Sequence, residues 1–346
     1  MIGLYLHHHG SGHRTRGTLI AHELCRYPGV EVTGLGTGPA PPGWPGSWVD
    51  LVPDDDRIGA DVEGVGPDVS AGDVLHWAPL RNPGLIRRQR QLVTWLDEAR
   101  PSVILVDVSV EVALQTRLCG IPVVVTALPG DRTDRPHTAA YDLAERLVAP
   151  WPAGTHERDW PARWRAKTCH VGGISRFAGM VPSPQDTTHG SDPRRVLTLW
   201  GAGGTQVGPA ELEAAQAGTP GWSWTHRGGP HAASPDLWAE LMQADVVVTH
   251  AGQNSVADVA CARRPAIVVA QDRPHGEQYA TARAVEQVGA ATGLAGWPEP
   301  HRWPGLLEQA VQRGGAGWAA WQESGAAARV AALLKECDDD VCRVPA

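Results

Sequence analysis

The sequence has few residues of several types, and each shortage excludes something. Its 346 residues include 1 Phe, 4 Tyr and 3 Met, and the 6 cysteines form no CxxC pair and no metal-ligand spacing. Scattered cysteines of this kind are typical of a reducing, cytoplasmic environment. No apolar run approaches the ~20 residues that a membrane-spanning helix needs. The opening MIGLYLHHHG has no basic n-region, so we expect no signal peptide.

Positive charge is also scarce. The chain has 30 Lys and Arg against 38 Asp and Glu, which gives a net charge of −8. A protein that binds the phosphate backbone needs a concentrated basic face, so nucleic acid is not an expected partner. The hydrophobic share of 42% is typical of a globular protein, and the length favours two domains. Tryptophan is abundant, with 15 residues, which we interpret first as compositional bias.

Short apolar runs rich in β-branched residues alternate with amphipathic stretches along the chain. The runs lie at residues 2–6, 102–106, 122–126, 196–200, 245–249 and 266–270. Near-continuous apolar strands separated by helices are typical of parallel sheets that helices cover on both faces. We therefore predict an α/β fold of two units whose sheets face a central cleft.

A segment rich in Pro, Gly, Ser and Asp separates the two units. It covers residues 177–193, so we predict an N-terminal domain at 1–176 and a C-terminal domain at 194–346, whose last helix can pack back on the first domain. In open parallel sheets, ligands bind where the strands end, because loops and helix N-termini offer N–H donors there. Functional residues are therefore expected in the loops that follow the strands.

The first candidate site follows the strand at residues 2–6. The sequence HHHGSGHRTRG places Gly12 and His13 at the start of a helix expected from Gly12 to Tyr27. Glycine allows the backbone to approach a ligand closely, and a helix start favours an anion. A polar strand end followed by a helix cap explains the same residues without a function. A zinc site at residues 7–9 is disfavoured, because alternate strand residues point to opposite faces.

Asp107 is the second candidate, and it directly follows the strand at residues 102–106. One interpretation is an N-cap for a helix that begins near Ser109. If Asp107 lies opposite His13, its carboxylate can orient the imidazole and make it a better general base. Glu111 is a reserve candidate for that base, although one turn into the helix a solvated role is more common.

The strongest pattern follows the strands at residues 245–249 and 266–270. A helix start near Gly252 offers free N–H groups beside small polar side chains, which suits a diphosphate without requiring cations. The candidates are His250, Gly252, Gln253, Asn254 and Ser255 for the diphosphate, Asp258 for a ribose, and Glu277 and Gln278 for the hydroxyls of a sugar. Simple N-capping by Asn254 and Ser255 explains one helix but not both loops.

A glycine-rich turn follows the strand at residues 196–200. Gly203 and Gly204 in this turn can add N–H donors to the same phosphates. The turn is not a P-loop, because the Gly-Lys-[Ser/Thr] ending is missing.

These motifs resemble those of the GT-B-fold glycosyltransferases that use nucleotide sugars. HAGQNSVADVACARRPAIVVAQDRPHGEQ resembles the donor-binding box of plant and antibiotic-pathway UDP-sugar transferases. Continued through YATARAVEQVGAA, it is also similar to the MurG-like transferase that adds N-acetylglucosamine to the lipid-linked peptidoglycan precursor. GSGHRTR and ILVDVSVEVALQTRLCGIPVVV resemble the matching N-terminal pieces. The likeness covers most of the chain as architecture and a smaller part as motif.

The resemblance implies a GT-B fold of two Rossmann-like domains and the inverting transfer of a hexose-type sugar from a UDP-sugar to an acceptor hydroxyl. It makes His13 the general base, oriented by Asp107, and assigns the donor to the residues from His250 to Gln278. Neither a metal nor a cofactor is expected, because the helix dipole offsets the charge of the leaving group and no Asp-x-Asp motif is present. The family more often has Glu at the place of Asp258. Plant enzymes have Trp at the place of Gln253. Because of this difference, the resemblance does not decide whether the base of the donor nucleotide is uracil, thymine or guanine.

The acceptor side is less defined. A basic amphipathic helix expected within residues 81–100, with Arg88 among its surface arginines, can lie on an anionic membrane at the cytoplasmic face or pack on a sheet. The first case suits a lipid-linked acceptor. Trp44, Trp48 and Trp77 are candidates to stack on an acceptor or to belong to the core.

Two other functions use the same residues. In a nucleotide-sugar hydrolase of the same fold, water replaces the acceptor, and GSGHRTR also resembles the G-x-G-H-x-x-R motif of such an enzyme. The other is an inactive protein that only binds a nucleotide sugar. It is disfavoured because His13, Asp107 and the donor box are all present.

Overall fold

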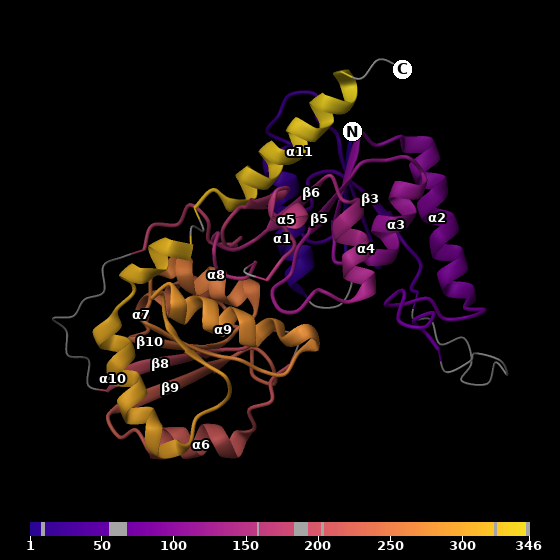
Figure 1. Ribbon diagram of the computed structural model, residues 1–346. Helices are drawn as coiled ribbons and strands as arrows, with labels where there is room; N and C mark the ends of the chain where they lie inside the picture. The colour runs from indigo at the N-terminus through magenta and orange to yellow at the C-terminus, as the bar shows by residue number, and fades with distance from the viewer. Residues whose placement is uncertain are drawn as a thin grey trace.

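The computed structural model describes residues 1–7, 11–54, 68–157, 159–182, 193–201, 204–321 and 324–343. It contains two α/β units, each built on one sheet (Figure 1). The strand order is β3-β2-β1-β4-β5-β6-β7 in the first sheet and β12-β11-β10-β8-β9 in the second. All strand pairs among the described residues are parallel. The predicted α/β fold class is confirmed.

The first unit carries the N-terminal half of the chain. Its strands are β1 (Ile2–Leu6), β2 (Val32–Gly36), β3 (Ser47–Asp50), β4 (Val103–Asp107), β5 (Val123–Thr126), β6 (Arg146–Ala149) and β7 (Thr168–His170). Its helices are α1 (Ser11–Leu24), α2 (Pro83–Ala99), α3 (Val110–Leu118), α4 (Arg135–Leu143) and α5 (Ala162–Arg165). The central strands β1 and β4 are buried at every position, which explains their continuous apolar sequences. Leu6 pairs with Asp107, so both strands end at the same level of the sheet.

The second unit repeats this plan. Its strands are β8 (Arg194–Leu199), β9 (Trp222–Arg227), β10 (Val246–His250), β11 (Ala266–Val269) and β12 (Thr292–Leu294). Its helices are α6 (Pro209–Ala217), α7 (Leu237–Gln243), α8 (Gln253–Ala262), α9 (Glu277–Gln287) and α10 (Trp303–Arg313), with the short helices η1 (Pro274–Gly276), η2 (Pro300–Arg302) and η3 (Ala316–Trp321). Because β10 lies between β8 and β11, the loops after these three strands share one edge of the sheet.

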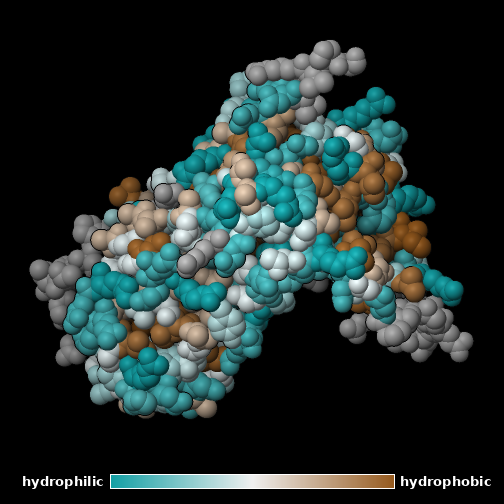
Figure 2. All heavy atoms as spheres, in the orientation of Figure 1, coloured by the Kyte–Doolittle hydropathy of each residue, from teal (hydrophilic) through white to brown (hydrophobic). Residues whose placement is uncertain are grey.

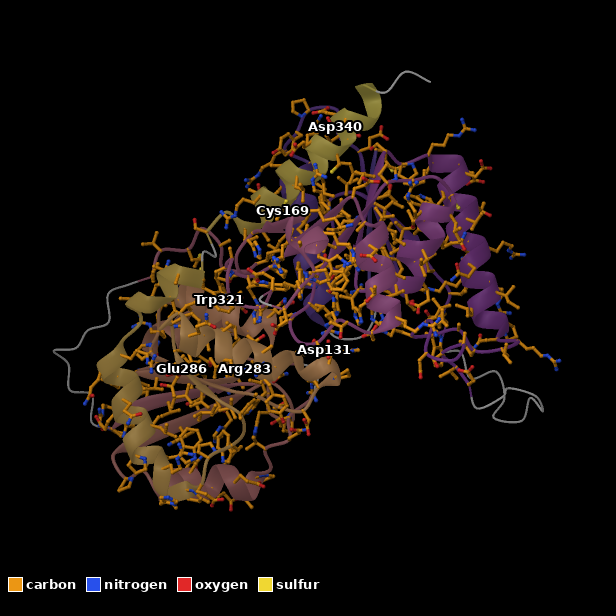
Figure 3. The ribbon with its side chains drawn as sticks, viewed as in Figure 1. Asp131, Cys169, Arg283, Glu286, Trp321 and Asp340 are labelled. Atoms are coloured by element: carbon orange, nitrogen blue, oxygen red, sulfur yellow. The ribbon has the colours of Figure 1, made fainter. Side chains whose placement is uncertain are left out.

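The chain passes between the units twice. The first passage follows β7, and its residues 183–192 lie outside the described part. The second leads from Trp321, at the junction of the two units, into α11 (Ala326–Arg343), which returns to the first unit and packs against α1 (Figures 1 and 3). There Val330 and Leu334 share a hydrophobic core with Ile2 and Ile20. The junction is tight, because a Cβ on Gly173 would lie 2.7 Å from the Trp321 ring.

The tryptophans are largely core residues. Trp151, Trp164, Trp303 and Trp318 are among the largest fully buried side chains, so indole rings fill the volume that Phe fills in most proteins. The abundance of tryptophan therefore has a role in core packing and is more than a compositional bias.

Of the two roles considered for Trp44 and Trp48, their placement fits the core role. Their rings lie 5.3 Å apart and cover β2 at Gly34, where a Cβ would come within 2.5 Å of both rings. Each indole N–H bonds a backbone oxygen, that of Ser47 for Trp44 and that of Gly38 for Trp48. These two rings belong to the packing of the sheet edge.

Helix α2 packs on the sheet through Leu92 and Leu96. The surface position expected for Arg88 is wrong, because its guanidinium is buried and bonds the Tyr5 hydroxyl at 2.8 Å and the Val52 oxygen at 2.7 Å. Ile86, on the outer face of the helix, is 65% exposed. Figure 2 shows hydrophobic side chains gathered on this side of the first unit. No helix in the described residues is long and apolar enough to cross a membrane.

Candidate active site

A cavity of about 250 Å³ lies between the two units, where β1, β8, β10 and β11 end. Ten of the residues predicted for the site line it: Gly12, His13, Gly204, His250, Gly252, Gln253, Asn254, Ser255, Glu277 and Gln278. Asp107 and Asp258 are buried outside this lining, and Gly203 lies outside the described residues. The loops after the parallel strands therefore meet as the topology requires.

His13 and Asp107 form a hydrogen-bonded pair at the cavity. His13 Nδ1 lies 3.0 Å from Asp107 Oδ2, and the side chains are 21% and 3% exposed. The N-cap interpretation of Asp107 is wrong, because Ser109 caps α3 by accepting the N–H of Val112 at 3.3 Å. With its Nδ1–H donated to Asp107, the ring carries its lone pair on Nε2, which is the arrangement of a general base.

Arg16 forms an ion pair with Asp107 and was not predicted from the sequence as a site residue. Its Nη2 lies 2.6 Å from Asp107 Oδ1, and its Nη1 donates to Gln253 Oε1 at 2.9 Å. Burial raises the pKa of Asp107, but the charges and hydrogen bonds of Arg16 and His13 outweigh it and hold that pKa well below its ordinary value. The signal was present in GSGHRTR, because residues three apart on a helix share one face.

Val108 shows that the turn after β4 is strained. Its φ is 66°, a left-handed conformation that β-branched residues rarely adopt. This turn lets Asp107 reach His13 while Ser109, only two residues later, caps α3. Strain of this kind concentrates at functional sites.

The opposite wall presents backbone N–H groups. Gly252 begins α8 without a side-chain cap. The Gly201 N–H points at Nε2 of His250 at 2.7 Å, and the Gly252 N–H points at Nδ1 at 3.0 Å. Burial, with a smaller effect of Arg273, lowers the pKa of His250 to about 4, so the ring is neutral at pH 7. A neutral imidazole accepts at one nitrogen only, so His250 can satisfy at most one of these two amides.

Cationic side chains also line the cavity, although the sequence predicted a diphosphate site that does not require them. Arg16, Arg176 and Arg273 all line it. Gln253 adds a neutral donor, since its buried Nε2 has no hydrogen-bond partner among the residues described. Guanidinium, amide and helix N–H groups together favour an anionic, oxygen-rich ligand.

The ribose contact predicted for Asp258 does not fit its placement. Its residue is 1% exposed, and Oδ1 accepts from the Ser175 hydroxyl at 2.8 Å. Oδ2 lies 2.9 Å from Nε of Arg176. The carboxylate faces the segment after β7, so in this conformation it joins α8 to the first unit instead of facing the cavity.

Glu277 and Gln278 begin α9 at the cavity edge. Glu277 Oε2 lies 3.3 Å from Nη2 of Arg132, which belongs to the first unit. Gln278 is buried, and its Oε1 accepts the N–H of Gln271 at 3.1 Å. Both residues line the cavity, and both already have protein partners.

A second cavity, of about 290 Å³, lies in the first unit and is lined by Trp77 together with Tyr5 and Leu85. His7 lines it, and the His7 ring centroid is 5.8 Å from that of His13. The reserve role of Glu111 as a base is not supported. Its Oε1 accepts the N–H groups of His76 at 2.8 Å and Trp77 at 3.0 Å, which shapes the wall of this cavity.

Changing Gly252 to alanine tests the wall formed by α8. The backbone of Gly252 suits alanine, but the new Cβ would lie 2.3 Å from Cε1 of His250. We expect nucleoside diphosphate affinity to fall by roughly tenfold, or about 1.4 kcal/mol, because His250 and the amides must move. Isothermal titration measures this change. Gly305→Ala is the control, since nothing lies within 4 Å of its Cβ position, and equal affinities in the two variants would reject the role of this wall.

The neutral state of His250 predicts a pH dependence of stability. The pKa is about 4 in the folded protein and about 6.5 in an unfolded chain, so the unfolded state binds more protons between these values. The contribution of His250 is therefore complete above pH 6.5 and is lost as pH falls to about 4. Urea unfolding of wild type and His250→Gln across this range measures it. A stability difference between the two proteins that stays constant with pH would contradict the burial of a neutral ring.

Comparisons with known proteins agree with this architecture. Residues 234–313 match the family model of the glycosyltransferase family 28 C-terminal domain, a range that includes His250 and Gln278. No curated protein matches the chain.

Solved structures match over nearly the whole length. The glycotransferase of kitacinnamycin is 18% identical with a TM-score of 0.65, covering 97% of this chain and 98% of that one. MurG of Acinetobacter baumannii is 15% identical with a TM-score of 0.65, covering 97% and 99%. CalG4, the calicheamicin glycosyltransferase, is 17% identical with a TM-score of 0.63, covering 100% and 99%. The predicted GT-B fold and the resemblance to these glycosyltransferases are confirmed.

Proposed function

Because the chain has the GT-B fold and a match to the family 28 C-terminal domain, we propose that it transfers a hexose-type sugar from a UDP-sugar to an acceptor hydroxyl with inversion at the anomeric carbon. One observation carries the proposal. His13, which is hydrogen-bonded to the buried Asp107, and the uncapped start of α8 face the same cavity from opposite units. A proton acceptor and an anion site on either side of one space are the requirements of a direct displacement.

In this mechanism the acceptor hydroxyl enters from the cavity that Trp77 lines. Nε2 of His13 takes its proton while the oxygen attacks the anomeric carbon, and the bond from that carbon to the diphosphate oxygen breaks. Asp107 stabilises the imidazolium that forms. The charge that develops on the diphosphate meets the N–H groups at Gly252 and the guanidinium of Arg273. These groups supply the stabilisation of the leaving group, so the proposed chemical step requires neither a metal nor a cofactor.

Binding of nucleoside diphosphates tests the donor site. UDP, dTDP and GDP are each titrated against the full chain, with UMP as the control that lacks the β-phosphate. We expect UDP to raise the melting temperature and UMP to raise it much less, because the α8 wall binds two phosphates. The absence of a shift with all three diphosphates would reject the donor site.

The outer face of α2 supports a proposal for the acceptor. Ile86 and Val93 are exposed there beside Arg87 and Arg90, which suits peripheral contact with anionic lipid at the cytoplasmic face and a lipid-linked acceptor. Flotation with vesicles that contain an anionic lipid measures the contact. Binding should weaken in Ile86→Glu, and equal flotation of both proteins would reject this role for α2.

A further inference from the structure

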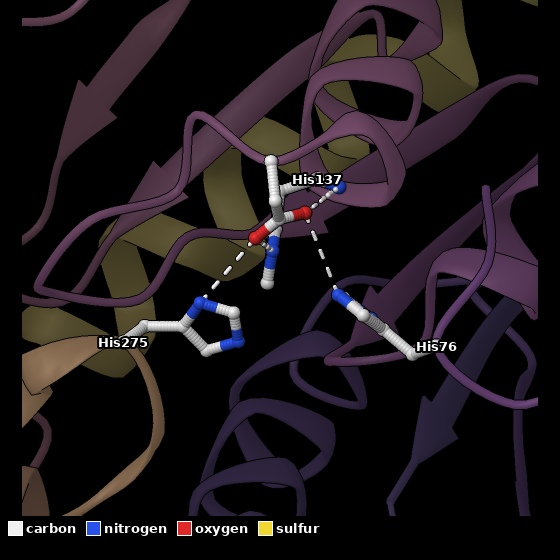
Figure 4. Close-up of side chains that lie close together, drawn as sticks. His76, His137 and His275 are labelled. Carbon is white, nitrogen blue, oxygen red and sulfur yellow. Dashed lines mark hydrogen bonds and ion pairs between the residues drawn. The ribbon is translucent and has the colours of Figure 1, made fainter. Parts of the chain in front are cut away.

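Three histidines and one aspartate from both units converge beside the active-site cavity. His76 precedes α2, Asp134 caps α4, His137 lies in the first turn of α4, and His275 lies in η1 of the second unit (Figure 4). One ligand atom from each of the four lies within 4.8 Å of all the others. Asp134 Oδ2 is 2.7 Å from Nδ1 of His137 and 3.3 Å from Nδ1 of His275, and Asp134 Oδ1 is 3.5 Å from Nε2 of His76.

We propose that these four side chains bind a divalent transition-metal ion, best Zn²⁺, which joins the two units. Three imidazole nitrogens and one carboxylate oxygen form a donor set that Zn²⁺ prefers, and four ligands suit its tetrahedral geometry. Bonds of about 2.0–2.1 Å place tetrahedral ligand atoms roughly 3.3 Å apart. The distances from the two Asp134 oxygens to the histidine nitrogens are 2.7, 3.3 and 3.5 Å, and all four ligand atoms lie within 4.8 Å of one another. The four atoms are therefore close to tetrahedral spacing, and coordination requires side-chain adjustments among the histidines.

Both ring nitrogens of His137 already have partners, because Nδ1 lies 2.7 Å from Asp134 Oδ2 and Nε2 lies 3.3 Å from Nη1 of Arg132. Binding of a metal ion therefore changes one of these two contacts. Coordination through Nδ1 of His137 places the proton on its Nε2, so Arg132 gives up its 3.3 Å contact there. Arg132 keeps its bonds to the Pro129 oxygen and to Glu277.

The backbone holds His275 against the first unit in a strained conformation. Its φ is 62°, which is uncommon for a residue with a side chain. The His275 oxygen accepts the N–H of Asp131 at 2.9 Å, and a Cβ on Gly130 would lie 2.2 Å from that oxygen. This close contact aims the ring at Asp134. Backbone strain at a cluster of metal-binding side chains is what a ligand loop shows when its geometry is fixed before binding.

The proposed metal acts on the loop that follows β11. His275 is two residues before Glu277, so a bond from His275 to the ion would hold the start of α9 against the first unit. We therefore expect the ion to raise donor affinity without touching the reacting atoms. This consequence rests on the proposed function, whereas metal binding itself does not.

Titration of the chelator-treated full chain with Zn²⁺ alone tests the site. Wild type should bind one tight equivalent, and Co²⁺ in its place should give the intense visible absorption of a tetrahedral site. His76→Ala and His275→Ala should each weaken Zn²⁺ binding by roughly tenfold or more. His301→Ala, at an exposed position, is the matched control, and a variant with His8 and His9 changed to Ala excludes binding by the histidine run of the sequence.

Three outcomes would overturn the proposal. They are no stoichiometric Zn²⁺ binding by folded wild type, unchanged affinity in both cluster variants, and loss of the equivalent in the variant that lacks His8 and His9. Circular dichroism confirms that each variant is folded. UDP titrations with and without Zn²⁺ separate the two proposals. Zn²⁺ binding without UDP binding rejects the donor site alone, and UDP binding without Zn²⁺ binding rejects the metal alone.

Discussion

Replacing His13 with alanine is expected to lower the rate of sugar transfer by roughly 10²–10⁴-fold, the usual contribution of a general base. Nucleoside diphosphate affinity should hardly change, because His13 lies on the acceptor side of the cavity and the N–H groups at Gly252 are untouched. Steady-state rates at saturating donor, together with calorimetric titration of UDP, measure the two effects separately.

His22→Ala is the matched control for this variant, since His22 is exposed on the same helix, α1. It should transfer sugar at the wild-type rate. Full activity in His13→Ala would reject the base assignment. A rate loss that comes with an equal loss of UDP affinity would instead make His13 a binding residue.

Asp107→Ala is expected to destabilise the fold strongly as well as to abolish transfer. The change leaves the guanidinium of Arg16 buried without its main partner, which lies 2.6 Å away in the native protein. Breaking a buried ion pair by removing one partner typically costs about 3–5 kcal/mol. The free energy of unfolding from urea titration should fall by about that amount.

Two companion variants separate stability from catalysis at this position. Asp107→Asn keeps the size and an oxygen acceptor, so it should lose less stability, but it cannot stabilise an imidazolium by charge. The double change Asp107→Ala and Arg16→Met removes both buried charges and should recover part of the lost stability without recovering transfer. Wild-type stability and transfer in Asp107→Ala would show that this pair has no role.

The core of the fold could be predicted from the sequence because buried parallel strands are continuous apolar runs. Strands β1, β4, β5, β10 and β11 lie within about one residue of their predicted ranges. The inner strands β2 and β6 were not predicted, and neither were the edge strands β3, β7, β9 and β12. These edge strands are short or half-buried, and β9 has the sequence WSWTHR. They therefore lack the continuous apolar run by which the buried strands were predicted.

The candidate site could be predicted where one short segment carries the pattern. The loops after β1, β10 and β11 gave His13, His250 and Glu277, and the topology brings these together. What sequence reasoning missed depends on pairing between distant segments. The buried guanidinium of Arg88 forms a hydrogen bond with the Tyr5 hydroxyl, and the carboxylate of Asp258 forms an ion pair with Arg176.

The four-residue cluster that we propose binds a metal was missed for a related reason. His76, Asp134 and His275 come from three segments that are far apart in the sequence. The spacing between the four ligand residues along the chain therefore matches no known metal-binding motif. Only the contact between the two units places the ligand atoms together.

Product analysis tests the central claim most directly. The full chain is incubated with UDP-linked hexoses and a panel of hydroxyl acceptors, and proton NMR follows UDP, free sugar and the anomeric configuration of the product. We predict that UDP release requires an acceptor and that the product has the configuration opposite to that of the donor. Free sugar released equally fast without an acceptor would identify a hydrolase instead. Retained configuration, or no release from any nucleotide sugar, would contradict the proposed displacement.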